Sequence, residues 1–87
     1  MPIHNEDIAL IFDEIADLLE IKEANPFRVR AYRNASHTVR ELGRELGELI
    51  NEGMALTELP GIGKELAAKI REIVETGTVS SIASRFL

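Results

Sequence analysis

A five-residue turn, Leu-Pro-Gly-Ile-Gly at positions 59–63, constrains the fold of this chain more than any other feature. Its two glycines allow the backbone to turn tightly and leave no Cβ to keep a ligand away. An amphipathic run follows at once over residues 64–70, and apolar residues at 56, 59, 66, 67, 70 and 73 flank the turn. This spacing predicts two short helices, near 55–59 and 64–76, joined by a tight turn.

The start of the helix predicted at residue 64 is a candidate anion site. The first N–H groups of a helix have no internal partner, and they lie at the positive end of the helix dipole. We therefore expect the backbone around Gly61, Ile62, Gly63 and Lys64 to bind nucleic-acid phosphates without regard to base sequence. A β-branched residue at either glycine should block this approach and the positive-φ turn. The alternative is a purely structural turn between two helices.

Helical patterns account for the rest of the chain. Asn5 is a candidate N-cap for a helix that runs to about residue 20, and Asn25-Pro26 begins a second helix that ends near Gly43. A short third helix is expected near 44–51. Gly77 closes the helix of residues 64–76, and a serine at 80 or 81 starts a last short helix. No strand pattern is present, so we predict one all-α domain of four to five helices over residues 1–87.

The composition narrows the class of protein. The absence of cysteine excludes a disulfide framework and the usual thiolate zinc site. No apolar run has the length of a membrane span and no signal segment precedes the domain, so we expect a cytoplasmic protein without a membrane partner. A net charge of −5 argues against a general nucleic-acid coat protein, yet residues 26–44 contain five arginines and one acid. That contrast favours a confined anion site.

Most cationic side chains of this segment fall on one face of the second helix, namely Arg30, Arg33, His37, Arg40 and Arg44. This stripe either follows a phosphate backbone or is partly neutralised by the acidic face of the first helix, and both interpretations remain open.

Arg28 lies instead on the apolar face, one turn before Tyr32. The two side chains are placed to present a guanidinium and a phenol to one anionic ligand. The alternative is a core tyrosine beside an arginine whose charge reaches solvent.

Lys69 lies at the border of the apolar face of the helix predicted at 64–76. A lysine near a phosphate site is a candidate Schiff-base nucleophile toward an aldehyde sugar, but only as the free amine. Glu65 and Glu72 are within one turn and favour its charged form. An ordinary phosphate-binding or ion-pairing lysine is therefore the favoured interpretation.

Taken together, the chain resembles the small N-terminal domain of family X DNA polymerases, the group that includes DNA polymerase beta, and is closest to the bacterial and archaeal members. The resemblance rests on four blocks in the family's order and spacing: Asn-Pro-Phe-Arg-Val-Arg-Ala-Tyr-Arg-Asn-Ala at 25–35, Leu-Thr-Glu-Leu-Pro-Gly-Ile-Gly-Lys at 56–64, Ala-Ala-Lys-Ile at 67–70, and Thr-Gly at 76–77.

The resemblance implies a SAM-like helical bundle with one helix-hairpin-helix, which holds the 5′-phosphate side of nicked or gapped DNA during base excision repair. It also implies a monovalent cation, Na⁺ or K⁺, held by the main-chain carbonyls of Thr57, Leu59 and Ile62. The palm domain that carries the polymerase carboxylates is absent, so we expect a monomeric fragment of a longer enzyme that cannot polymerise alone.

The resemblance also bears on enzyme activity. Some family members are deoxyribose-phosphate lyases, and Lys69 matches their Schiff-base lysine, Tyr32 a tyrosine of that site, and Arg28 a supporting lysine. Glu65, however, stands where lyase-competent members have a lysine, and Phe27 replaces a histidine. We therefore expect weak or no lyase activity and retained phosphate binding. A lyase acting through Lys69 and a helical protein-interaction domain, which the acidity favours, are the alternatives.

Overall fold

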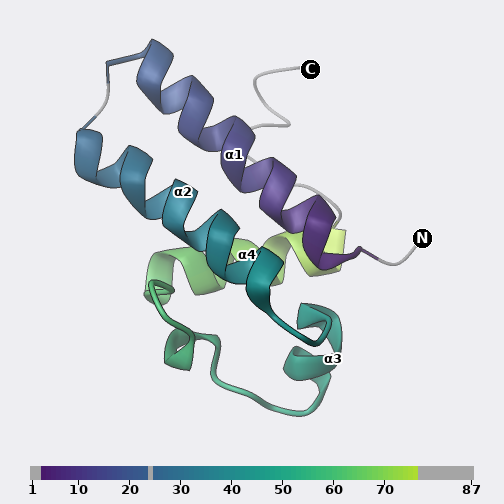
Figure 1. Cartoon of the computed structure of the whole chain (residues 1–87). Coiled ribbons are helices and arrows are strands. Elements are labelled where there is room, and N and C mark those ends of the chain that lie inside the picture. Colours follow the sequence, from purple (N-terminus) through teal and green to yellow (C-terminus); the bar gives the residue numbers. More distant parts are fainter. Residues whose placement is uncertain (1–2, 24, 77–87) are drawn as a thin grey trace.

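The computed structural model describes residues 3–23 and 25–76, and within them every regular element is a helix (Figure 1). The α-helices are α1 (Asn5–Ile21), α2 (Pro26–Glu41), α3 (Leu46–Asn51) and α4 (Lys64–Thr76), and a single 3₁₀ turn, η1 (Leu56–Glu58), precedes α4. The predicted all-α class is confirmed. Gly77 and the two serines expected to begin a last helix lie outside the described residues.

The N-cap of α1 is His4, so the assignment of Asn5 to that position is wrong. The carboxylate of Asp7 accepts a hydrogen bond of 2.9 Å from the amide of His4, which is one half of a capping box. Asn5 is the first helical residue, and its side chain is not available to cap α1 because it reaches across to α3.

The starts of α1 and α3 cap each other. The Asn5 side chain donates to the carbonyl of Arg44 (2.7 Å) and accepts from the amide of Leu46 (2.8 Å). In return, the carboxylate of Glu45 accepts from the amide of Asn5 at 2.9 Å. Unpaired donors at two helix starts, far apart in the sequence, are thereby satisfied together.

The start of α2 is as predicted: Pro26 takes the first helical position, and the Asn25 side chain accepts from the amide of Phe27 at 2.8 Å. The helix ends at Glu41, slightly before the predicted Gly43. Leu42 already has extended backbone and packs against the core, so this leucine rather than the glycine determines the end.

The core lies between α1, α2 and α4. α1 and α2 run antiparallel side by side, and α4 crosses the pair (Figure 1). Phe12 of α1 meets the ring of Tyr32 of α2 edge-on, with 5.6 Å between ring centroids. Leu46 of α3 and Leu56 of η1 are also buried, so tertiary packing holds segments that are too short to be stable alone. Within the described residues, no helix has both the length and the apolarity needed to cross a bilayer.

Candidate functional site

The turn between η1 and α4 is anchored by its apolar residues and presents its glycines. Leu59 and Ile62 are buried, and the amide of Ile62 donates to the carbonyl of Leu59 at 3.1 Å. Gly61 is exposed with φ of +76°, a conformation that favours glycine. Gly63 is exposed too, but its φ is not positive, so the prediction of a positive-φ requirement holds for Gly61 alone.

The predicted unpaired amides are present at the start of α4. The amide of Ala67 is the first to be bonded, to the carbonyl of Gly63 at 2.9 Å. Within the described part of the chain, no acceptor is provided for the amides of Lys64, Glu65 and Leu66. These three donors lie at the positive end of a thirteen-residue helix, as a phosphate site requires.

A hydrogen bond from α2 fixes the position of the turn. The hydroxyl of Thr38 donates to the carbonyl of Pro60 at 3.0 Å. The bond joins residues that are 22 positions apart, so nothing local in the sequence indicates it. It holds the turn against the helix that carries Arg28 and Tyr32.

A cleft of about 300 Å³ separates the start of α2 from the start of α4. It brings together five residues that the sequence analysis assigned to one phosphate site. Its lining consists of Arg28, Ala31 and Tyr32 from α2, Gly61 and Gly63 from the turn, and Lys64, Glu65 and Leu66 from α4.

Tyr32 belongs to the core and to the cleft at once, so the two interpretations of this residue are not exclusive. It is only 2% exposed, and its hydroxyl has no hydrogen-bond partner among the described residues. Burial raises the pKa of this phenol, and the charge of Glu65 adds to the rise. The guanidinium of Arg28 opposes it, because it lies close to the hydroxyl although the two do not form a hydrogen bond of ordinary geometry. Because both charges act on the hydroxyl, it lies near the two charged side chains of the cleft.

Arg28 is exposed rather than buried on the apolar face. Its guanidinium donates to the carboxylate of Glu65 at 3.2 Å, and more than half of each side chain is exposed. Sequence spacing placed Glu65 beside Lys69, one turn along α4, whereas the structure pairs it with Arg28. No short-range pattern indicates this contact, since the two residues are 37 positions apart.

Lys69 and Arg33 lie outside the lining of the cleft. Lys69 is half-buried on α4 and forms no salt bridge with another described residue. Arg33 donates to Asp17 at 2.9 Å and to Glu20 at 2.8 Å, and these hydrogen bonds raise the pKa of its guanidinium.

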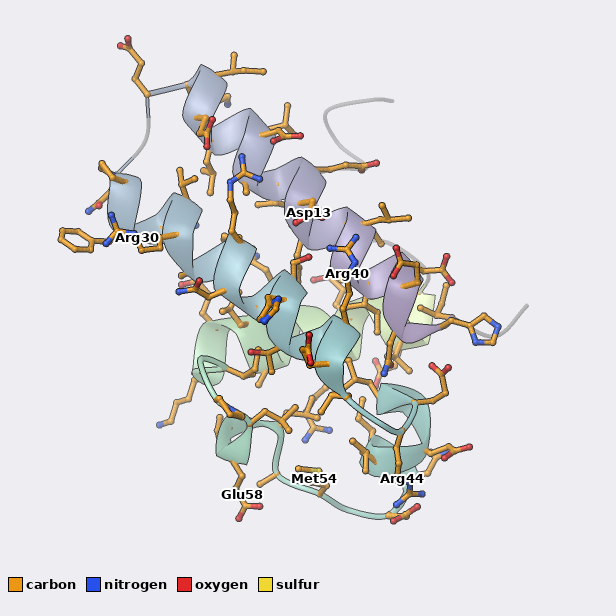
Figure 2. The ribbon with its side chains drawn as sticks, in the orientation of Figure 1. Asp13, Arg30, Arg40, Arg44, Met54 and Glu58 are labelled. Carbon is orange, nitrogen blue, oxygen red and sulfur yellow. The ribbon has the colours of Figure 1, made fainter. Side chains whose placement is uncertain are left out.

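The arginine stripe is partly neutralised by the acidic face of α1, through Arg33 and Arg40, as one of its two interpretations expected. Arg40 binds Glu6 and Asp13 of α1, and Figure 2 shows Arg40 and Asp13 facing each other between the helices. Arg40 also donates to the buried hydroxyl of Ser36, which donates to the carbonyl of Ala9 at 3.1 Å. Arg44, beyond the end of α2, contacts Glu48 and Glu52. Arg30 instead lies over the ring of Phe27, 5.8 Å from its centroid.

The carbonyls implied as cation ligands are at the turn. That of Leu59 already accepts from the amide of Ile62, which leaves it one lone pair. Those of Thr57 and Ile62 receive no hydrogen bond from a described backbone amide outside the helices. Oxygen donors of this kind suit a hard cation.

Comparisons with known proteins agree with this architecture. Residues 3–79 match the family described as "Helix-hairpin-helix domain". The chain is also 33% identical, over 82 residues, to the protein named "DNA polymerase/3'-5' exonuclease PolX" of Bacillus subtilis. That match covers 94% of this chain but 14% of the relative, so the similarity concerns a small part of that protein. The family match and the tight turn between η1 and α4 lead to one conclusion: this chain belongs to the helix-hairpin-helix domain family.

Proposed function

We propose that this domain is the DNA-binding module of a family X repair polymerase and that it holds the 5′-phosphate side of nicked or gapped DNA. One observation carries the proposal: the cleft joins the amides at the start of α4 to the guanidinium of Arg28 and the hydroxyl of Tyr32, and neither these amides nor this hydroxyl has a hydrogen-bond partner among residues 3–23 and 25–76. Amides, a guanidinium and a hydroxyl all donate hydrogen bonds, and a phosphate accepts them.

The distribution of charge supports a localised contact. Arg33, Arg40 and Arg44 are each held by two carboxylates, and Arg30 lies over the ring of Phe27. Arg28 has one carboxylate partner and lines the cleft. An extended phosphate backbone laid along α2 would have to displace those carboxylates. A single phosphate in the cleft requires no such displacement at the stripe, so terminal recognition is favoured over a long electrostatic footprint.

The test compares three fluorescently labelled DNAs by anisotropy: a gapped duplex with a 5′-phosphate, the same duplex with a 5′-hydroxyl, and an intact duplex. We expect the phosphorylated gap to bind tightest. Gly63→Val should weaken its binding at least about tenfold, because a side chain would stand between the amides and the phosphate. Gly43→Val is the matched control, since a Cβ at either glycine meets no described atom within 4 Å. Unchanged affinity in Gly63→Val would contradict the hairpin assignment.

A second pair of variants tests the terminal phosphate. Arg28→Ala should cost about 1.5–3 kcal/mol of binding, as for a lost charge-assisted hydrogen bond, and only when the 5′-phosphate is present. Arg33→Ala should cost less on either DNA, because its guanidinium already serves Asp17 and Glu20. Equal losses on phosphorylated and unphosphorylated gaps would make Arg28 a generic backbone contact.

The bound cation and the weak or absent lyase activity also belong to this proposal, and each needs its own test. If the carbonyls of Thr57, Leu59 and Ile62 hold Na⁺ or K⁺, affinity for gapped DNA should fall when tetramethylammonium replaces either ion at equal ionic strength.

For the lyase, borohydride trapping on an abasic 5′ end should give little adduct. Efficient trapping that disappears in Lys69→Ala would establish Schiff-base chemistry.

A further inference from the structure

We propose that Glu65 is an internal competitor of the phosphate: its carboxylate occupies the guanidinium of Arg28, and a terminal phosphate has to displace it. This inference rests on the proposed function of the cleft. It assigns to Glu65 the control of how tightly and how selectively the cleft binds a terminal phosphate.

The ion pair between Arg28 and Glu65 lies within the cleft. Arg28 donates to the Glu65 carboxylate at 3.2 Å, and both residues line the cleft. A carboxylate and a phosphate present the same kind of acceptor oxygen to a guanidinium, so they compete for the same donors. Arg28 lies on α2 and Glu65 on α4, so the ion pair spans the mouth between the two helices that form the cleft.

Glu65 also lies at the positive end of α4. It is the second residue of this helix, where a negative charge is stabilised by the helix dipole. A phosphate at the amides of Lys64, Glu65 and Leu66 would use the same positive helix end. Glu65 therefore opposes a bound phosphate twice, through the guanidinium and through the dipole.

The ion pair between Arg28 and Glu65 is exposed. More than half of each side chain is open to solvent, so the ion pair is screened and costs little to open. Glu65 is thus a weak competitor that lowers the affinity for phosphate without closing the site. Because a terminal phosphate bears more charge than an internal one, it is repelled more by the carboxylate but gains more from a freed Arg28.

The test is a double-mutant cycle on the full chain with the phosphorylated and unphosphorylated gapped DNAs. Glu65→Gln keeps the shape of the side chain and removes its charge. We expect it to raise affinity for the phosphorylated gap about fivefold or more, and for the unphosphorylated gap less than about twofold. Glu75→Gln, an equal charge change at the exposed far end of α4, should raise both by less than about twofold.

The second arm asks whether Glu65 acts through Arg28. In an Arg28→Ala background, Glu65→Gln should lose most of its gain, since no guanidinium remains to be released. An equal gain on both DNAs, or a gain that persists undiminished without Arg28, would overturn the proposal and leave only general repulsion of DNA. No gain in a chain that binds phosphorylated gaps would refute the role of Glu65 while the proposed function stands.

If the chain does not bind gapped DNA, the proposed function is refuted. The role of Glu65 is then tested by a separate measurement. Titration with inorganic phosphate is followed by NMR through the amides of residues 61–66, with thermal unfolding of each variant as a control for folding. Tighter phosphate binding in Glu65→Gln than in the wild type supports competition at the cleft. Equal binding overturns it.

Discussion

Replacing Tyr32 with phenylalanine should make this domain more stable, because it removes a buried hydroxyl that has no hydrogen-bond partner among the described residues. Leaving such a group unsatisfied costs about 1–3 kcal/mol. The variant keeps the aromatic ring, and with it the edge-on contact to Phe12 at 5.6 Å. We therefore expect Tyr32→Phe to raise the free energy of unfolding by about 1 kcal/mol, at the lower end of the range.

Urea and thermal unfolding, followed by far-UV circular dichroism at neutral pH, measure this change. A gain of 1 kcal/mol corresponds to a rise in Tm of about 4–8 °C for a domain of this size. Tyr32→Leu is the control, since it also removes the hydroxyl but disturbs the packing around Phe12, and it should be less stable than the wild type by about 1–3 kcal/mol.

The same variant should bind a phosphorylated gap less well, by about ten- to a hundredfold, the range for a hydrogen bond to a charged group. A hydroxyl that lowers stability and raises affinity is what a site kept for a ligand requires. The reasoning is refuted if Tyr32→Phe is less stable than the wild type, because the hydroxyl would then gain more from a partner than its burial costs.

Other variants probe the turn and the α1–α2 contact. Gly61→Ala should lower stability by about 1 kcal/mol in urea unfolding, because its φ of +76° strains a residue with a Cβ; an unchanged midpoint would contradict this. Ser36→Ala should cost about 0.5–1.5 kcal/mol, since it removes one buried hydrogen bond, from the Ser36 hydroxyl to the carbonyl of Ala9. Partial burial is the largest single influence and tends to raise the pKa of the Asp13 carboxyl, but the hydrogen bond and charge of Arg40, together with Ser36 and Arg33, outweigh it, so the pKa lies below its usual value. The stabilisation is therefore complete above the unfolded pKa of about 3.9 and disappears as pH falls through the lower folded pKa, so Asp13→Asn should flatten the acid loss of stability between about pH 5 and pH 2.

The helices were predictable where a local signal marks them. Asn25 followed by Pro26 fixes the start of α2, and the run after Gly63 gives α4 its bounds of Lys64 and Thr76. The errors fall where a tertiary contact decides instead. Asn5 has the right chemistry for an N-cap, yet α3 uses its side chain and His4 takes the cap position.

The candidate site was predictable as a set of residues but not as a set of contacts. The resemblance and the helix periodicity together named Arg28, Tyr32 and Lys64, which do line one cleft. The pairing of Arg28 with Glu65 was not foreseen, because the sequence gives neighbours along a helix and not across two helices. The arginine stripe shows the same limit, since only the packing of α1 on α2 decides whether its charges are free.

The mutual capping of α1 and α3 makes the middle of this chain depend on its beginning. α3 has six residues, too few to persist alone, and its first amide is held by a side chain 41 positions earlier. A chain shortened past Asn5 would lose the hydrogen bonds that fix the start of both helices, and Leu46 would no longer be fixed in its buried position in the core. In hydrogen exchange, the amide of Leu46 should therefore open together with the first turn of α1, as one cooperative unit.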